Sequence, residues 1–312
     1  MERVDVVAAS AFYPPVMEAL TATYAVHALY QAADRAAFFA PLKDKVRGIA
    51  TFTDKVDAGL MDTLPRLEIV ASMSIGLDHI DLAAAKARGI RVTNTPDVLT
   101  DDVADLAIGL MVAVSRRLVV ADRYVRDGGW LKGSMPLQNR LGGTKLGVLG
   151  MGRIGAAIAK RAAAMNMTVV YHGPRPKPEV PYRFYPDLAA MAADVDYLVV
   201  AVPGGPATRH LVDARIIAAL GAKGTVINIA RGSVIDQAAL IAALADHKLA
   251  GAGLDVFEDE PRVPEALTGL DSVVLTPHVG SATHPTRLAM GRLMLDNLAA
   301  HFAGKPLLTP VV

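Results

Sequence analysis

Three stretches in the second half of the chain carry side chains that could hold an acid and transfer a proton. Arg231, in "NIARGSVID", and His278, in "LTPHVGSAT", each follow an apolar run typical of a buried strand. After a third such run, "GLDVFEDEP" offers four acids: Asp255, Glu258, Asp259 and Glu260. Arginine matches a carboxylate bidentately, histidine exchanges a proton near neutral pH, and a carboxylate beside an imidazole favours its charged form. Together they could anchor a 2-keto acid and protonate its carbonyl oxygen during reduction.

A single histidine at the end of a strand is more often structural than catalytic. In an open parallel sheet, however, ligands bind beyond the carboxyl ends of the strands, so successive strand ends can converge on one site. The combination of arginine, acid and histidine therefore favours catalysis.

A glycine-rich turn in "KLGVLGMGRIG" has the G-x-G-x-x-G spacing, follows an apolar strand and opens an alanine-rich helix. Gly150 permits the tight turn, Gly152 lets the backbone approach a pyrophosphate, and Gly155 lets the helix pack closely on the strand. The amides of Arg153 and Ile154 begin the helix and can meet phosphate charge. A plain glycine turn in an α/β core is the alternative, but this context favours dinucleotide binding.

The residues at the end of the next strand predict which dinucleotide is bound. An acid that bonds the ribose of NAD is expected about 20 residues after the glycine turn, yet "VVYHGPRPKPE" has Gly173 there. Glycine leaves room for the 2′-phosphate of NADP, and Arg175 and Lys177 can pair with it. We expect NADPH, with NADH as a poorer substitute; which base meets the phosphate stays open. An exposed, proline-stiffened loop with incidental bases is the alternative.

Composition narrows the class of protein. The 312 residues are long for one domain, and 52% apolar with 20% charged residues is typical of a globular protein with a large core. A net charge of +1 argues against a nucleic-acid or membrane-surface protein. The absence of cysteine excludes disulfides and thiolate metal sites, and we expect no metal. With no signal-peptide pattern and no bilayer-length apolar run, a cytoplasmic location is expected.

The elements that must position these residues are short apolar strands alternating with helical patterns, which predicts α/β architecture with two doubly wound parallel sheets. The strands of the first sheet are expected over 4–9, 24–29, 46–51, 67–72 and 90–93. Those of the second are expected over 145–150, 167–172, 196–202, 224–230, 250–256 and 272–278.

Two sequence boundaries predict a discontinuous domain. Near "TNTPDVLTDD", Pro96 ends a strand and Thr100 or Asp101 can cap a long helix. Near "GSATHPTR", Pro285 can begin a terminal helix that packs back on the first sheet. A Rossmann cofactor domain is thus expected to be inserted in a flavodoxin-like substrate domain. The expected ranges are 1–97 with 285–312 for the substrate domain and 98–284 for the dinucleotide domain.

Six motifs make the chain resemble the D-isomer-specific 2-hydroxyacid dehydrogenases over nearly its whole length: "SIGLDHID", "NTPDVLTDDVAD", "GMGRIG", "NIARGSVID", "GAGLDVFEDEP" and "PHVGSAT". Within that family, "YHGPRPKPE", "RDGGW" and "GKPLLTPVV" are similar to NADPH-dependent glyoxylate/hydroxypyruvate reductases and plant-type hydroxyphenylpyruvate reductases.

The resemblance implies roles for individual residues. Arg231 would bind the substrate's carboxylate and carbonyl, with His278 as acid/base and Glu260 as its partner. The loop that receives the substrate carboxylate through amide hydrogens is matched by Ser74, Ile75 and Gly76. Asp255 would lie near the nicotinamide carboxamide. The remaining cofactor contacts are Thr100, Val103, Val202, Pro203, Thr208, Ile229, Ala230 and Gly280.

The same resemblance implies a homodimer, with residues 100–126 as a plausible interface. Trp130 would reach into the neighbouring subunit's active site, although a lone tryptophan in a loop is an equally good reading.

The expected activity is reduction of glyoxylate or hydroxypyruvate. Hydroxyphenylpyruvate and 2-ketogluconate are alternative substrates, although Met73 stands where an aromatic side chain commonly precedes the loop in hydroxyphenylpyruvate reductases. A nucleotide-sensing scaffold without turnover is the alternative from another class. Formate dehydrogenase is disfavoured because Glu260, and not a glutamine, accompanies the histidine.

Overall fold

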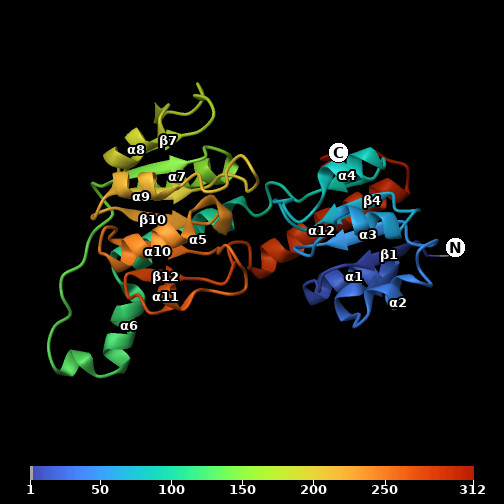
Figure 1. Cartoon of the computed structure of the whole chain (residues 1–312), viewed down its shortest axis with the longest axis horizontal. Helices are drawn as coiled ribbons and strands as arrows, with labels where there is room; N and C mark the ends of the chain where they lie inside the picture. Colours follow the sequence, from blue (N-terminus) through green and yellow to red (C-terminus); the bar gives the residue numbers. More distant parts are fainter. Residues whose placement is uncertain (1–2) are drawn as a thin grey trace. The chain divides into compact units, whose positions relative to one another are not determined.

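The computed structural model describes residues 3–312 as two units. Residues 3–99 and 281–312 form the first unit, and residues 100–280 form the second (Figure 1). The sequence predicted that the first unit ends at residue 97 and resumes at residue 285. These limits lie two residues before 99 and four residues after 281. Each unit is a parallel sheet covered by helices, so the predicted fold class, two parallel α/β domains, is confirmed.

The sheet of the first unit has five parallel strands in the order β2-β1-β3-β4-β5. Its strands are β1 (Asp5–Ala8), β2 (Ala25–Ala28), β3 (Gly48–Thr51), β4 (Ile69–Ser72) and β5 (Arg91–Thr93). The central strands β3 and β4 are buried along their whole length, as expected where helices cover both faces of a parallel sheet.

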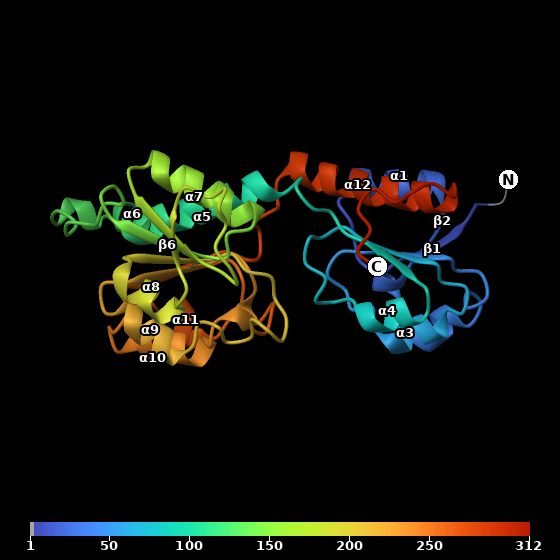
Figure 2. The same ribbon diagram turned by 90° about the horizontal axis from the view of Figure 1, so that it is seen from above.

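Helices lie on both faces of this sheet (Figure 2). They are α1 (Pro14–Thr23) and α12 (His284–Phe302) on one face and α3 (Ala58–Thr63) and α4 (Leu82–Ala87) on the other, with α2 (Arg35–Phe39) nearby in the chain. Thr283 caps α12 by accepting the Thr286 amide, and Pro285 occupies its first turn. Gly291 allows α12 to approach α1, because a Cβ there would lie 2.1 Å from Val16. The last helix therefore completes the first unit.

The sheet of the second unit has seven parallel strands in the order β12-β11-β10-β9-β6-β7-β8. Its strands are β6 (Lys145–Leu149), β7 (Thr168–His172), β8 (Arg183–Tyr185), β9 (Tyr197–Val200), β10 (Thr225–Asn228), β11 (Gly251–Leu254) and β12 (Val273–Leu275). The strand order reverses at β6, which pairs with both β7 and β9. In such sheets the crevice at this reversal, beyond the carboxyl ends, is where ligands bind.

Two layers of helices cover the second sheet (Figure 2). One layer holds α5 (Thr100–Ser115) and α7 (Arg153–Ala164), and the other holds α8 (Leu188–Asp194), α9 (Ala214–Leu220), α10 (Gln237–Ala245) and α11 (Glu265–Thr268). Helix α6 (Leu118–Arg126) follows α5. The N-cap residues of α8, α9 and α10 are Asp187, Asp213 and Asp236. Each carboxylate accepts a hydrogen bond from an amide of the first turn.

Two details differ from the sequence-based predictions. Strand β8 was not predicted, because its three residues begin with an exposed arginine and are not part of an apolar run. Thr100 does not cap α5: it is the first helical residue, and its hydroxyl is buried without a hydrogen-bond partner in the described chain.

Candidate active site

Adjacent strands β10, β11 and β12 bring the three chemically suggestive stretches to one edge of the second sheet. Arg231 follows β10, Asp255 follows β11, and His278 follows β12. Because these strands are parallel neighbours, their carboxyl ends lie side by side. One edge of the sheet therefore carries three loops. Two of them lead from a strand to a helix and hold Arg231 and the acids, and the third holds His278.

Glu260 is the acid that contacts His278. The histidine Nδ1 lies 2.7 Å from Glu260 Oε2, and Glu260 Oε1 accepts the Phe257 amide at 3.0 Å. Burial raises the pKa of the Glu260 carboxyl, but the hydrogen bonds from His278 and Phe257, with the charges of His278 and Arg231, outweigh burial and bring the pKa below its usual value. The carboxylate is therefore ionised at neutral pH, and His278 Nε2 is left for a ligand.

Asp255 holds the loop that carries His278. Its Oδ1 accepts the Thr276 hydroxyl at 2.6 Å and the Val279 amide at 2.9 Å, and its Oδ2 accepts the Gly280 amide at 2.8 Å. The side chain is only 2% exposed. This role was not predicted from the sequence, which placed Asp255 beside the cofactor. An acid directly after a strand, three residues before the "EDE" run, was the available signal.

His278 itself has a left-handed backbone, with φ of 52°. Such a conformation is uncommon for a residue with a side chain, and it persists where surrounding contacts impose it. The amide of His278 donates to the Asp255 carbonyl at 2.9 Å, in addition to the three bonds that the Asp255 carboxylate makes around it. The direction of the imidazole is thus set by the loop.

Arg231 is positioned by a buried asparagine at the end of β10. Asn228 Oδ1 accepts the Ala230 amide at 3.0 Å, and its Nδ2 donates to the Arg231 carbonyl at 2.9 Å. Gly232 lets the loop pass close to the acids, because a Cβ there would lie 1.9 Å from the Phe257 backbone. Asn228 was missed from the sequence, where a polar residue inside an apolar strand was the signal.

The glycine turn after β6 fits a dinucleotide pyrophosphate. Gly150 has φ of 98°, and a Cβ there would lie 2.6 Å from the Ala201 carbonyl. A Cβ on Gly155 would lie 2.0 Å from the Gly150 carbonyl, whereas a Cβ on Gly152 would meet no atom within 4 Å. Gly152 precedes α7 and provides no side-chain cap. The start of α7, at Arg153 and Ile154, is therefore a helix N-terminus that a phosphate can approach.

The loop after β7 carries the two predicted bases. Its backbone is anchored by the Lys177 amide, which donates to the Tyr171 hydroxyl at 2.7 Å. The side chain of Arg175 is exposed, and space is open around Gly173. In the part of the chain that the structure describes, Arg175 and Lys177 make no ion pair. These side chains can therefore meet a phosphate group without first breaking other salt bridges.

The other predicted cofactor residues lie on the same edge of the second unit. Val202, Pro203 and Thr208 follow β9, and the Thr208 hydroxyl donates to the Pro203 carbonyl at 2.7 Å. Ile229 and Ala230 follow β10 and are buried. Gly280 lies by Val103 of α5, since a Cβ on Gly280 would come within 3.3 Å of it. The buried, unpaired hydroxyl of Thr100 is a polar atom that a ligand could satisfy.

A second histidine–glutamate pair lies in the loops of this edge. His210 Nε2 is 2.6 Å from Glu258 Oε1, which joins the loop after β9 to the loop after β11. This pair was not predicted, because the two residues are 48 positions apart and His210 belongs to none of the motifs.

In the first unit, the loop after β4 has a fixed shape and two open amides. The Ser74 hydroxyl donates to the Gly76 carbonyl at 2.6 Å, and Asn94 Nδ2 donates to the Ile75 carbonyl at 3.1 Å. Among residues 3–312, no acceptor is found for the amides of Ile75 and Gly76. Such a loop can bind a carboxylate through its backbone.

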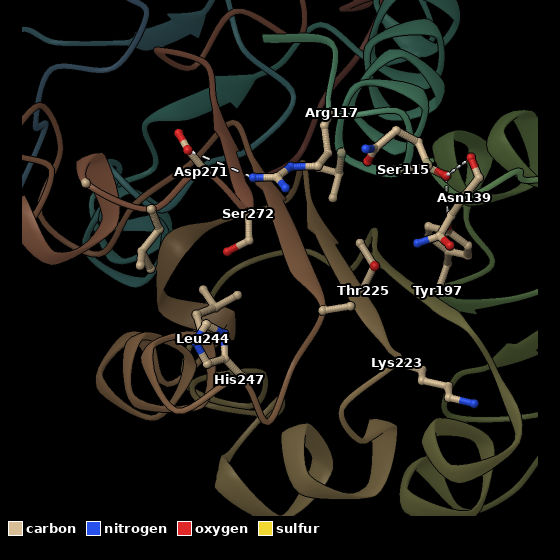
Figure 3. Close-up of a pocket in the computed structure, with 15 residues that line it drawn as sticks. Ser115, Arg117, Asn139, Tyr197, Lys223, Thr225, Leu244, His247, Asp271 and Ser272 are labelled. Carbon is tan, nitrogen blue, oxygen red and sulfur yellow. Dashed lines mark hydrogen bonds and ion pairs between the residues drawn. The ribbon is translucent and has the colours of Figure 1, made fainter. Parts of the chain in front are cut away.

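A cavity of about 460 Å³ lies at the opposite edge of the second sheet (Figure 3). Tyr197 and Thr225, which begin β9 and β10, line it together with Arg117, Lys223 and His247. The cavity lies at the amino ends of the strands and is thus separated from their carboxyl ends by the length of the strands. In the described residues no group of His, Asp and Glu could hold a metal ion, and no helix is long and apolar enough to cross a membrane.

Comparisons with known proteins agree with this geometry. Residues 108–280 match the model of the D-isomer specific 2-hydroxyacid dehydrogenase, NAD binding domain. The chain is 56% identical over 256 residues to glyoxylate/hydroxypyruvate reductase A of Arabidopsis thaliana, covering 82% of each protein. It is 42% identical over 309 residues to the 2-ketogluconate reductase of Gluconobacter oxydans, covering 99% of this chain and 98% of the relative.

A solved structure shows the same likeness over the full length. The NADPH-dependent glyoxylate/hydroxypyruvate reductase of Sinorhizobium meliloti, in complex with NADP and malonate, is 44% identical with a TM-score of 0.95. The match covers 100% of this chain and 97% of that chain. The resemblance found in the motifs is confirmed, and the chain belongs to the family of D-isomer specific 2-hydroxyacid dehydrogenases.

Proposed function

We propose that the protein reduces a small 2-keto acid, glyoxylate or hydroxypyruvate, to the D-2-hydroxy acid with NADPH. The observation that carries the proposal is the carboxyl edge of the second sheet. There an arginine and a histidine–glutamate pair follow β10, β11 and β12, and the Gly150–Gly155 turn follows β6. NADPH would supply the hydride. Relatives that carry these activities by name support the choice of substrate.

In this proposal each residue has one task. Arg231 binds the keto acid and polarises its carbonyl. His278 donates the proton on Nε2 to the carbonyl oxygen as the hydride arrives. Glu260 stabilises the imidazolium and fixes the ring, because its carboxylate accepts from Nδ1. The open amides of Ile75 and Gly76 receive the substrate carboxylate.

We assign cofactor binding to the second unit and substrate binding to the first, as the predicted ranges 98–284, and 1–97 with 285–312, imply. The pyrophosphate is assigned to the Gly150–Gly155 turn. The 2′-phosphate is assigned to Arg175 and Lys177, which are supported by the open space at Gly173 and by the absence of ion pairs to either base in the described residues.

The test is steady-state NADPH oxidation with glyoxylate, hydroxypyruvate, hydroxyphenylpyruvate and 2-ketogluconate, repeated with NADH. We expect the first two substrates and NADPH to give the highest kcat/KM. Arg175→Ala and Lys177→Ala should lower kcat/KM for NADPH, about tenfold for the base that pairs with the phosphate, and leave NADH unchanged. Equal efficiency with both cofactors would contradict the NADPH assignment, and no turnover on any keto acid would favour a scaffold.

We also propose a homodimer in the cytoplasm. Six large apolar side chains are exposed between residues 118 and 137: Leu118, Val119, Val125, Trp130, Leu131 and Leu137. So many exposed apolar groups in one segment support an interaction surface there. Trp130, 69% exposed, is proposed to contact the partner subunit. Sedimentation of the wild type and of Leu131→Ser with Leu137→Ser would test this, since a dimer through this segment should dissociate in the variant.

A further inference from the structure

Arg287, near the start of α12, holds its charge in unfavourable surroundings. The side chain is partly buried, and its Nη1 is buried without a hydrogen-bond partner in the described chain. Burial lowers the pKa of the guanidinium. It is the fourth residue of a 19-residue helix, where the helix dipole also disfavours a cation. A buried charged donor without an acceptor is destabilising, so the position calls for an anion or a polar oxygen that the chain does not provide.

The guanidinium lies over an aromatic ring. Its Cζ lies 4.5 Å from the ring centroid of Phe52, the residue that follows β3. The Phe52 amide donates to Ser10 Oγ at 2.8 Å, and the Ser10 hydroxyl donates to Asp54. The Asp54 carboxylate is thus engaged by Ser10, and no ion pair joins it to Arg287 among residues 3–312.

The position of α12 places Arg287 at the carboxyl edge of the first sheet. At the other end of the helix, His301 Nε2 lies 3.1 Å from Glu68, just before β4, and Phe302 packs on Gly48, which begins β3. The helix therefore runs opposite to β3 and β4, and its first turns lie where these strands end. Both Arg287 and Phe52 are at that edge.

The loop of Ser74, Ile75 and Gly76 leaves the same edge from the neighbouring strand. Thr51 and Ser72 are paired across β3 and β4, and the Met73 amide donates to the Thr51 carbonyl at 2.8 Å. Phe52 and the loop with the open amides therefore start from adjacent positions. Phe52, and with it Arg287, therefore lies beside the start of the loop that is proposed to receive the substrate carboxylate.

We propose that Arg287 is a specificity residue that donates a hydrogen bond to an oxygen on the carbon beyond the reacting carbonyl. The inference rests on the proposed function and names its substrate class: 2-keto acids with a hydroxyl or carboxylate at C3, such as hydroxypyruvate. Phe52 supports the guanidinium through its ring face. Glyoxylate, which has no C3, makes no use of the residue.

The test compares hydroxypyruvate with pyruvate, which differ only in the C3 hydroxyl, in the full-length protein at saturating NADPH. In Arg287→Met, kcat/KM for hydroxypyruvate should fall at least about tenfold, the effect of losing a hydrogen bond from a charged donor. The values for pyruvate and glyoxylate should change less than about threefold. Arg287→Lys, which keeps the charge but not the planar fork, should fall between wild type and Arg287→Met.

Arg292→Met is the matched control, since Arg292 is exposed on the same helix. It should leave all three substrates unchanged. An equal fall in kcat/KM for all three substrates in Arg287→Met and Arg287→Lys would overturn the inference, because it indicates a structural role. No change in kcat/KM for any substrate would overturn it as well. If Arg287→Met fails to fold, the hydroxypyruvate-to-pyruvate ratio of Arg287→Lys decides. If the wild type is active on keto acids but the hydroxypyruvate-to-pyruvate ratio is unchanged in the Arg287 variants, this inference alone is wrong. If the wild type is inactive on every keto acid, the proposed function is wrong.

Discussion

The carboxyl edge of the second sheet carries two histidine–glutamate pairs of nearly the same geometry. His278 is 2.7 Å from Glu260, and His210 is 2.6 Å from Glu258. Both histidines have left-handed backbones, with φ of 52° and 50°. Their side chains are similarly exposed, at 40% and 35%. Neither the ion pair nor the unusual backbone therefore distinguishes a catalytic histidine here.

The two pairs differ in the ring nitrogen that is left open. His278 uses Nδ1, so that Nε2, at the tip of the ring, stays available to a substrate. His210 uses Nε2, so that the tip of its ring is occupied by Glu258. The nitrogen left on His210 lies next to its own backbone. The comparison teaches that the orientation of the ring, and not the presence of a carboxylate, decides whether a histidine can protonate a ligand.

The pairs also differ in their support. Glu260 accepts a second bond from the Phe257 amide, and the loop of His278 is fixed by Asp255. The carboxylate of Glu258 accepts from His210, while its amide donates to Gln237. The first pair, the proposed proton donor, is thus held in place by its own loop, and the second pair joins two loops.

The two pairs should differ most in the loss of kcat that follows replacement of their histidines. In His278→Gln we expect kcat to fall roughly 100- to 10,000-fold, the usual loss of a general acid, with NADPH binding kept. In His210→Gln the fall should be less than about tenfold, since no proton donor is lost. Steady-state rates with NADPH titrations measure both effects. Similar losses of kcat in the two variants would show that the ring orientation does not assign the role.

The next difference should appear in the pH dependence of the glutamate variants. The pKa of Glu260 is lowered, so its negative charge is present throughout the neutral range and favours the protonated imidazole. Glu260→Gln removes that charge, and the alkaline fall in kcat/KM should therefore move to lower pH. Glu258→Gln should leave the fall in place. An unmoved profile in Glu260→Gln would contradict the pairing as an electrostatic device.

The lowered pKa of Glu260 also bears on stability. A group with a depressed pKa in the folded state stabilises that state above its unfolded pKa, and the stabilisation is lost as pH falls through the folded value. Wild type should thus lose more stability than Glu260→Gln on acidification below about pH 4.5, the ordinary value for a glutamate. Thermal melts of both proteins across this range measure the difference.

A smaller effect should follow from loosening the support of His278. Asp255→Asn replaces an acceptor of three hydrogen bonds by an amide that can satisfy only part of them, and should lower the free energy of unfolding by about 1–3 kcal/mol. Asp259→Asn is the control, because Asp259 makes only an exposed ion pair with Arg262 and its replacement should change the free energy of unfolding little. Denaturant melts give both values; equal losses would mean that Asp255 is not the anchor of the loop.

The smallest effect should come from Glu258→Gln at neutral pH. The hydrogen bond that joins the loop after β9 to the loop after β11 loses its charge and weakens, so the KM for NADPH should rise less than about tenfold while kcat is kept. A loss of kcat without a change in KM would place this pair in the chemical step.

Much of the framework follows from local sequence. The G-x-G-x-x-G turn requires glycines at Gly150 and Gly155 for steric reasons that involve only nearby backbone, and the apolar runs predict all strands except the three-residue β8. Because parallel strands end on one edge, placing Arg231 and His278 at strand ends was enough to predict that they share it. The cap predicted at Thr100 was wrong, because Thr100 is itself the first residue of the helix.

The sequence by itself determined which residue types stand at the ends of which strands, since periodicity and glycine spacing are local properties. It left four acids after β11 as equal candidates on physical grounds, and no pattern around His210 or Arg287 predicted a role for either residue. The family resemblance implied the pairing of Glu260 with His278, 18 residues apart, and the tertiary structure shows the contact. Only the tertiary structure turned Asp255 toward the loop and placed Arg287 on Phe52. Those contacts depend on how long-range packing aims each side chain, and no local pattern encodes that direction.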